Sequence, residues 1–295
     1  MEAPVVFAPA KLNLYLAVTG RRADGFHDLV SVVAPLDFGD RLRAEAAAGL
    51  ALRCDDDTVP TGGDNLVVKA AQAFARKTGW PGGVRFTLEK RIPMGAGLGG
   101  GSSDAVAALR ALNHLAGPRW ALAEPDLHEV AAELGSDCPL FLIGGPVVLR
   151  GRGERVTRLA EAGACRIRGR RVLVFKPGFG IATPWAYGQL VARAPAGYVP
   201  AAEAERRLTA WLEDEGAPVE RLLANNLEAP AFAKFLALPV LLGELQRRFG
   251  VTGRMSGSGS ACYVLLPDGL AADPLVAVVR AAWGESAFVQ EARLE

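Results

Sequence analysis

The N-terminal part of the chain alternates between apolar and polar positions with the period of a β-strand. From Leu12 to Val18 every second residue is leucine or valine, and Lys11 and Asn13 lie at polar positions of the same alternation. Because successive side chains of a strand point to opposite faces, the pattern predicts a strand over residues 5–18 in which Lys11 and Asn13 share the face opposite the leucines. On spacing alone, the simpler interpretation is an exposed lysine on the polar side of an edge strand.

Two further strands are predicted before the first helix. They cover residues 29–36 and 41–45, and the segment between them, residues 37–40, has the Asp and Gly residues of a tight turn. Consecutive strands without intervening helices disfavour the opening of a doubly wound sheet. The pattern therefore favours an α+β class for this part of the chain.

Helical periodicity follows these strands. Asp64 is a candidate N-cap of a helix whose apolar face includes Val67 and Phe74. Further helices are predicted at residues 127–134, 202–215, 219–223, 236–249 and 274–283, and further strands at residues 84–89, 147–150, 171–175, 263–266 and 287–292. We expect a first domain over residues 1–155 and a second over residues 156–295, with the last strand a candidate to return to the first domain.

A glycine-rich loop precedes one of the helical patterns. Five glycines lie between Pro93 and Ser102, and the apolar helical pattern continues to Leu115. Glycine lets the backbone adopt left-handed angles and approach a ligand closely, and the unpaired N–H groups of a helix N-terminus attract phosphate. Ser102 or Ser103 is a candidate cap of this helix. The loop is therefore predicted to hold phosphate groups.

Common phosphate loops do not fit this segment. Its glycines match the dinucleotide fingerprint, but that fingerprint needs a strand directly before the loop and a second strand with an acidic residue after the helix. Here Lys-Arg-Ile-Pro leads into the loop, and the next predicted element is another helix. The Gly-Lys-Ser/Thr tripeptide of a Walker loop and the His-Arg-Asp signature of protein kinases are absent from the sequence. A dinucleotide-binding protein is therefore disfavoured.

Composition narrows the function further. Half of the 295 residues are apolar and the net charge is +1, so we expect a globular core and no basic footprint for nucleic acid. No apolar run reaches the length of a membrane helix, and the N-terminus lacks a signal-peptide pattern. The four cysteines are scattered, which is typical of reduced thiols in a cytoplasmic protein. The three histidines are not clustered as in a structural metal site.

Three motifs in order along the chain resemble those of the GHMP small-molecule kinases. They are Pro-Ala-Lys-Leu-Asn-Leu at residues 9–14, the glycine loop, and Met-Ser-Gly-Ser-Gly-Ser-Ala-Cys at residues 255–262. The resemblance implies an α+β, two-lobed GHMP kinase fold with an active-site cleft between the lobes. It also implies an ATP-dependent small-molecule kinase that works with Mg²⁺.

Two shorter segments narrow the resemblance. Arg-Ala-Asp-Gly-Phe-His at residues 22–27 and Gly-Ser-Asp-Cys-Pro-Leu-Phe at residues 135–141 are similar to those of family members that phosphorylate the tertiary 2-hydroxyl of a cytidine-diphosphate-linked polyol in the non-mevalonate isoprenoid pathway. We expect small-molecule partners, no nucleic acid, no membrane, and a monomer or homodimer. Two alternatives stay open, namely a homoserine- or mevalonate-type kinase and a catalytically silent nucleotide- or sugar-sensing protein on the same fold.

The resemblance implies catalytic roles for Lys11 and Asp137. Asp137 is implied as the base that takes the proton of the acceptor hydroxyl. Lys11 is implied to lie beside it, to hold the carboxylate ionised and to steady charge on the transferring group. An Asp shortly before Pro139 is also typical of a helix cap, so capping is the structural alternative for Asp137.

The resemblance also implies residues that bind the acceptor. The turn at Phe26 and His27 presents an aromatic ring and an imidazole to the cytosine, and Tyr187 supplies a second aromatic face. Phe26 stands where the family often has tyrosine, which keeps a stacking surface and removes a hydroxyl. The tryptophan two residues before Tyr187 competes for its role. Asn13 and Thr183 are further candidates for acceptor binding.

The nucleotide is assigned to the glycine loop and to the start of an earlier helix. The resemblance implies that ATP binds Pro93, Gly95, Gly97, Leu98, Gly99, Gly100, Gly101, Ser102 and Ser103. Asn65 is implied to meet the adenine. Ser103 is a candidate to approach Mg²⁺, although no metal ligand is assigned, and Asp104 would repel phosphate unless a metal or a cation intervenes. The third motif is expected to buttress this loop, and Asn-Asn-Leu-Glu at residues 225–228 is given no catalytic role.

Overall fold

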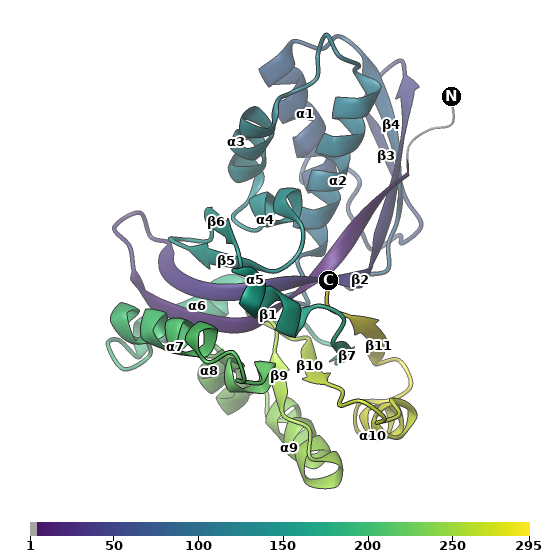
Figure 1. Cartoon of the computed structure of the whole chain (residues 1–295). Helices are drawn as coiled ribbons and strands as arrows, with labels where there is room; N and C mark the ends of the chain where they lie inside the picture. Colours follow the sequence, from purple (N-terminus) through teal and green to yellow (C-terminus); the bar gives the residue numbers. More distant parts are fainter. Residues whose placement is uncertain (1–4) are drawn as a thin grey trace. The chain divides into compact units, whose positions relative to one another are not determined.

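The described chain begins with two long strands, β1 (Val5–Arg21) and β2 (His27–Ala47) (Figure 1). The chain divides into two compact units, and each of these strands has residues in both. The structure is a computed structural model that describes residues 5–295. Of the described residues, unit 1 holds residues 5–10 together with Phe38–Met94 and Gly99–Gly144. Unit 2 holds Lys11–Asp37, Gly95–Leu98 and Gly145–Glu295. The units are therefore not two successive halves of the chain.

Unit 1 combines strands with four helices. Within it β2 pairs antiparallel with β4 (Gly83–Glu89), and β3 (Ala51–Cys54) runs parallel to β4. The helices are α1 (Leu66–Thr78), α2 (Gly100–Leu115), α3 (Glu124–Leu134) and α4 (Cys138–Ile143). The predicted apolar face with Val67 and Phe74 is fully buried on α1, which packs against α2.

β2 runs without a break through the turn predicted at residues 37–40. That prediction is wrong because Asp40 is fully buried, and its Oδ1 accepts the backbone N–H of Ile92 at 2.8 Å. Gly39 allows a close approach, since a Cβ there would lie 2.2 Å from the carbonyl oxygen of Ala8. Gly39 and Asp40, which are typical turn residues in the sequence, therefore lie within an extended strand and make close contacts with neighbouring segments.

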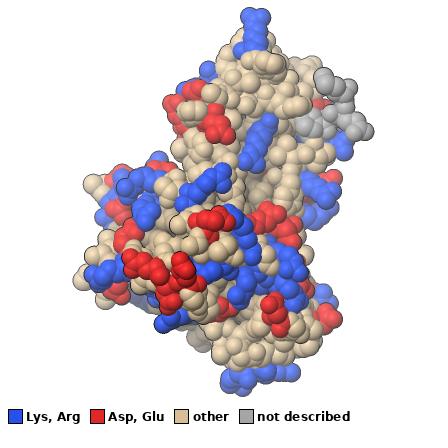
Figure 2. All heavy atoms as spheres, viewed as in Figure 1, with Lys and Arg blue, Asp and Glu red and all other residues tan. Residues whose placement is uncertain are grey.

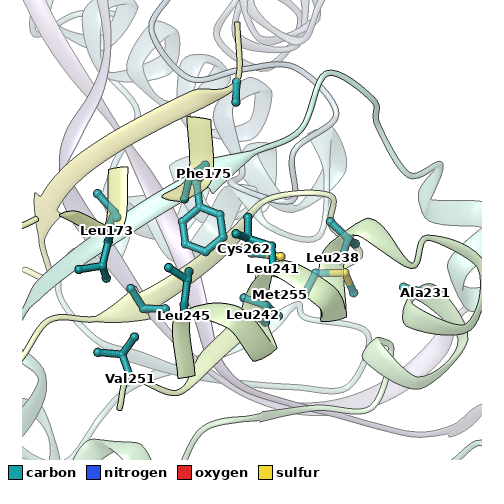
Figure 3. Close-up of a cluster of buried hydrophobic side chains, with 14 of the residues drawn as sticks. Leu173, Phe175, Ala231, Leu238, Leu241, Leu242, Leu245, Val251, Met255 and Cys262 are labelled. Carbon is teal, nitrogen blue, oxygen red and sulfur yellow. The ribbon is translucent and has the colours of Figure 1, made fainter. Parts of the chain in front are cut away.

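The centre of unit 2 is a four-stranded antiparallel sheet in the order β11, β7, β10, β9. These strands are β7 (Arg171–Lys176), β9 (Gly253–Met255), β10 (Cys262–Leu265) and β11 (Phe288–Arg293). Phe175 of β7 and Leu245 of α9 (Ala237–Phe249) belong to the buried hydrophobic cluster of this unit (Figure 3). The last strand of the chain therefore pairs with β7 inside unit 2.

The remaining elements of unit 2 include some that no sequence pattern predicts. They are β5 (Val147–Arg150), β6 (Arg155–Arg158), β8 (Ala224–Asn225), α5 (Glu161–Ile167), α6 (Thr183–Ala192), α7 (Ala201–Glu213), the 3₁₀ turn η1 (Val219–Arg221), α8 (Glu228–Lys234) and α10 (Asp273–Trp283). The elements β6, α5 and α8 have seven residues or fewer, so no apolar period stands out in them. β5 pairs with β2, and β8 runs parallel to β1.

Charged side chains are spread over the face of the molecule drawn in Figure 2, where basic and acidic groups are interspersed in the lower part of the view. This mixture agrees with the net charge of +1. None of the helices within residues 5–295 is long and apolar enough to cross a membrane.

Candidate active site

Lys11 and Asn13 lie on a buried face of β1 in unit 2. Lys11 is 4% exposed, and its Nζ donates a hydrogen bond to Oδ1 of Asn13 at 2.5 Å. Nδ2 of Asn13 in turn donates to Oγ of Ser31 at 3.0 Å. The interpretation of Lys11 as an exposed edge-strand residue is wrong because another loop covers this face. A Cβ added to Gly257 would lie 3.4 Å from Nζ of Lys11.

Ser256 joins the first motif to the glycine loop. Its Oγ donates to the carbonyl oxygen of Gly97 at 3.0 Å and accepts the backbone N–H of Asn13 at 3.3 Å. A second link runs from the backbone N–H of Lys11 to the carbonyl oxygen of Leu98 at 2.9 Å. The first motif, the start of the glycine loop and the third motif therefore meet within unit 2, although they lie far apart in the sequence.

Glycine is required where these segments approach one another. Gly97 has a φ of +78°, and a Cβ there would lie 2.2 Å from the carbonyl oxygen of Ser256. Gly257 has a φ of +57°, and its Cβ would lie 3.2 Å from Oδ1 of Asn13. At both positions the backbone angle and the lack of space favour glycine. The third motif can therefore lie directly against the side chains of the first.

The segment at residues 225–228 holds the third motif in place. Nδ2 of Asn225 donates to the carbonyl oxygens of Met255 and Gly257, both at 2.8 Å. Oε1 of Glu228 accepts the backbone N–H of Met255 at 2.8 Å, and burial raises the pKa of this carboxyl to about 7. Nothing in the local pattern predicts this support, because side-chain bonds to a distant loop leave no periodic signal.

His27 and Tyr187 form part of an aromatic cluster in unit 2. Their ring centroids are 4.9 Å apart and the rings are tilted by 44°. Trp185 instead packs edge-on against Phe235, with the centroids 5.4 Å apart. The sequence left both Tyr187 and Trp185 as candidates for the second aromatic face. Tyr187 is the one that lies beside His27.

The other acceptor candidates also belong to unit 2. Oγ1 of Thr183 lies 2.9 Å from Oγ of Ser258, which links the start of α6 to the third motif. Phe26 is 49% exposed, and the guanidinium of Arg152 lies over its ring, 4.9 Å from the centroid. An exposed aromatic ring of this kind is a suitable surface for stacking. Unit 2 thus contains every residue that the sequence assigned to the acceptor, namely Asn13, Phe26, His27, Thr183 and Tyr187.

In unit 1, the N-terminus of α2 carries no side-chain cap. The N-cap residue is Gly99, with a φ of +74°, and the helix begins at Gly100. The prediction that Ser102 or Ser103 caps this helix is wrong, because both serines lie within its first turn. Ser103 is 1% exposed, and its buried Oγ has no hydrogen-bond partner among the described residues. An uncapped helix start with a buried unpaired hydroxyl fits a phosphate ligand.

Asp137 precedes α4, close to the first turn of α2. Asp137 occupies the N-cap position of α4, as the capping alternative predicts, but its side chain makes no capping hydrogen bond to that helix. Burial raises the pKa of the Cys138 thiol to about 12, and the side chain of Ser102 opposes this rise. A Cβ added to Gly135 would lie 3.5 Å from Sγ of Cys138 and 3.9 Å from Oγ of Ser102. These contacts place the start of α4 beside the first turn of α2.

A buried lysine lies between two buried carboxylates next to α2. Nζ of Lys90 is 2.5 Å from Oδ2 of Asp40 and 2.6 Å from Oδ2 of Asp104, and the three side chains are at most 6% exposed. Burial raises the pKa of Asp104 to about 7, and the charge of Lys90 opposes this rise. A Cβ added to Gly100 would lie 3.0 Å from Nζ. Lys90, which no motif marked, is therefore the cation that accompanies Asp104 at the start of α2.

Asn65, and not Asp64, caps α1. Oδ1 of Asn65 accepts the backbone N–H of Val67 at 2.8 Å, and Nδ2 donates to the carbonyl oxygen of Pro60 at 2.6 Å. The prediction for Asp64 is wrong by one residue because either residue type can cap a helix. The contact of Asn65 with adenine stays a prediction, and it has to coexist with these two hydrogen bonds.

The start of α2 has no side-chain cap and holds a buried unpaired hydroxyl, and both features suit the phosphates of a nucleotide. Within residues 5–295, no three His, Cys, Asp or Glu side chains are grouped as metal ligands. Mg²⁺ at nucleotide sites is commonly held by phosphate oxygens and only one or two protein groups. The Oγ of Ser103 is the one buried side-chain oxygen of the predicted set that has no hydrogen-bond partner within the described residues.

Two family models match parts of the chain, and curated proteins match most of it. The GHMP kinases N terminal domain matches residues 65–145, and the GHMP kinases C terminal domain matches residues 212–285. The 4-diphosphocytidyl-2-C-methyl-D-erythritol kinase of Prochlorococcus marinus (strain MIT 9313) is 39% identical over 277 residues, which cover 89% of this chain and 84% of that protein. The protein of the same name from Thermus thermophilus is 42% identical over 260 residues, which cover 88% of this chain and 86% of that protein.

Solved structures share the fold. A crystal structure of 4-(cytidine 5'-diphospho)-2C-methyl-D-erythritol kinase is 38% identical, covers 98% of this chain and 99% of its own, and superposes with a TM-score of 0.77. Homoserine kinase from Cytophaga hutchinsonii is 17% identical with a TM-score of 0.72, which is a likeness of fold alone. The predicted α+β fold is confirmed, and the chain belongs to the GHMP kinase family.

Proposed function

We propose that this protein uses ATP to phosphorylate the tertiary 2-hydroxyl of 4-diphosphocytidyl-2-C-methyl-D-erythritol, a step of the non-mevalonate route to isoprenoid precursors. The observation that carries the proposal is the aromatic pair His27 and Tyr187 in a chain 36–42% identical to kinases named for this acceptor. An aromatic pair of this kind suits a nucleobase, which has a flat face and a polar edge. Homoserine and mevalonate have no such ring.

Asp137 is the base of the proposed reaction. A carboxylate that accepts the proton of the acceptor hydroxyl makes its oxygen a better nucleophile as the phosphoryl group transfers. The position of Asp137 supports this role, because it lies at the N-cap of α4, whose first residue Cys138 lies near Ser102 in the first turn of α2. Lys11 is the cation that stabilises negative charge developing during the transfer.

The start of α2 holds the nucleotide phosphates. The backbone N–H groups of Gly100 and Gly101 and the hydroxyl of Ser103 are the donors of the proposed cradle. ATP with Mg²⁺ supplies the transferable phosphoryl group and neutralises part of its charge. The side chains of Lys90 and Asp104 lie against this end of the helix and set the local charge there.

The acceptor is bound by residues of unit 2. Tyr187 and His27 contact the cytosine, and the exposed ring of Phe26 adds a stacking surface. Asn13 and Thr183 hydrogen-bond the rest of the acceptor in this proposal. The bond between Nζ of Lys11 and Asn13 supports it, because it orients the amide that faces the third motif.

A coupled assay of ADP release over a panel of acceptors tests the proposal. We expect turnover with 4-diphosphocytidyl-2-C-methyl-D-erythritol and none above background with homoserine or mevalonate. Turnover with homoserine or mevalonate but not with the cytidyl acceptor would assign the protein to another branch of the family. No turnover with any acceptor, together with retained ATP binding, would favour a sensing protein.

A further inference from the structure

Two polar atoms of the aromatic cluster are buried without a hydrogen-bond partner among residues 5–295. They are Nε2 of His27 and the hydroxyl of Tyr198. The two rings are 6.0 Å apart between centroids and are tilted by 37°. A buried polar atom without a partner is costly and uncommon in folded proteins. Two of them in one cluster indicate that the partner is supplied from outside the chain.

The backbone, and not the hydroxyl, fixes the position of Tyr198. The N–H of Tyr198 donates to the carbonyl oxygen of Pro195 at 3.1 Å, and the next N–H, of Val199, donates to the carbonyl oxygen of Val18 on β1 at 3.1 Å. On the other side, the carbonyl oxygen of Gly197 accepts from Nδ2 of Asn226 at 3.0 Å. The loop is therefore anchored on both sides of Tyr198 without any contribution from its hydroxyl.

The two unpaired atoms complement the edge of a pyrimidine. Burial and the nearby charge of Arg21 lower the pKa of His27, so its imidazole is neutral near pH 7 and has one donor and one acceptor nitrogen. The hydroxyl of Tyr198 can donate or accept. A cytosine has an amino donor beside its ring nitrogen and carbonyl acceptors. The pair can therefore satisfy a donor and an acceptor of one base at the same time.

We propose that Tyr198 is a substrate-binding residue whose hydroxyl, beside Nε2 of His27, hydrogen-bonds the polar edge of the base that stacks on Tyr187. This inference rests on the proposed function, since it deepens the same acceptor site. No motif of the sequence pointed to Tyr198, which lies in the loop after α6. Its role follows from the unpaired hydroxyl and from its place next to His27.

Tyr198→Phe tests the inference because it removes the hydroxyl and keeps the ring. We expect the KM for the cytidyl acceptor to rise about 3- to 10-fold, as for the loss of one hydrogen bond, with the KM for ATP and kcat unchanged. The affinity for CDP, measured by calorimetry without ATP, falls by the same factor. The melting temperature stays equal or rises, because the hydroxyl lost is one that the free protein leaves unsatisfied.

Tyr15→Phe is the matched control. The hydroxyl of Tyr15 donates to the carbonyl oxygen of Ala204 at 3.2 Å, so its loss is expected to lower the melting temperature and to leave CDP affinity unchanged. If Tyr198→Phe behaves like this control, the hydroxyl serves the fold and the inference is overturned.

The CDP titration separates this inference from the proposed function. Wild-type turnover of the cytidyl acceptor with unchanged CDP affinity in Tyr198→Phe would overturn the inference alone. CDP binding that depends on Tyr198, without turnover of the cytidyl acceptor, would support the inference and overturn the proposed function. Absence of CDP binding to the wild-type protein would overturn the inference, and together with no turnover of the cytidyl acceptor it would overturn the proposed function as well.

Discussion

Asp137 is the residue on which the proposed chemistry depends most. Asp137→Asn keeps the size of the side chain and removes the proton acceptor, so we expect kcat to fall by about 10²- to 10⁴-fold. ATP affinity is expected to stay unchanged, because the nucleotide donors belong to α2. Steady-state kinetics with the cytidyl acceptor and a titration of ATP binding measure the two effects separately.

Asp64→Asn provides the matched control for this substitution. Asp64 is exposed, and Asn65 caps the helix in its place, so the control is expected to keep kcat within about twofold. If Asp137→Asn turns over as fast as the control, Asp137 has no part in the proton transfer.

At the scale of residues, the sequence predicts which side chains share a face but not what covers them. The alternation around Leu12 correctly placed Lys11 and Asn13 together, yet it could not show that Gly257 lies against both. That contact joins segments far apart in the chain, and local periodicity contains no record of it. The roles of Lys90 and Tyr198 were not predicted for the same reason, because each role depends on contacts with residues that are distant in the sequence.

At the scale of elements, Lys90 links α2 to β2 and to the segment that leads into the glycine loop. Lys90→Met would leave the carboxylates of Asp40 and Asp104 buried without their cation. We expect a loss of about 3–5 kcal/mol in the free energy of unfolding, measured by urea denaturation. We also expect weaker ATP binding, because the substitution removes a positive charge that lies against Gly100, at the proposed phosphate end of α2.

The neighbouring residue supplies the control for this prediction. Arg91 pairs with Asp55 at 2.8 Å, but the two side chains are 52% and 41% exposed, so Arg91→Met is expected to cost much less stability than Lys90→Met. Equal losses in the two variants would mean that the Lys90 cluster contributes no more than a surface ion pair.

Amphipathic helices were the elements that the sequence predicted best. The predicted cap of α1 is one residue from the observed cap, α2 ends at Leu115 as predicted, and α9 (Ala237–Phe249) matches the helix predicted at residues 236–249. β2 was predicted as two strands because residues 37–40 resemble a turn. Turn propensity is a local signal, and the burial of Asp40 in contact with Ile92 overrides it.

At the scale of the whole molecule, the order of three motifs predicted the family, while the division into units could not be predicted. Residues 11–37 belong with the C-terminal half because β1 pairs with β8 and β2 pairs with β5. No single cut of the chain, such as one near residue 155, separates the two units. The pairing of strands that are distant in the sequence determines which segments form each unit. The periodicity along a single strand gives no information about that pairing.

The dependence of stability on pH is also a property of the whole molecule. Burial raises the pKa of Glu228 from 4.5 to about 7. Between these values the folded protein binds more protons than the unfolded chain, so this group lowers the free energy of unfolding as the pH rises. Glu228→Gln removes the titration, and the amide oxygen can still accept the N–H of Met255.

The stability of the variant relative to wild type, measured by urea denaturation at several pH values, should therefore increase from about pH 4.5 to 7 and level off above. The contributions of the other carboxyls, including Asp104, cancel in this difference. A difference that does not change with pH would show that the pKa of Glu228 is not raised in the folded protein.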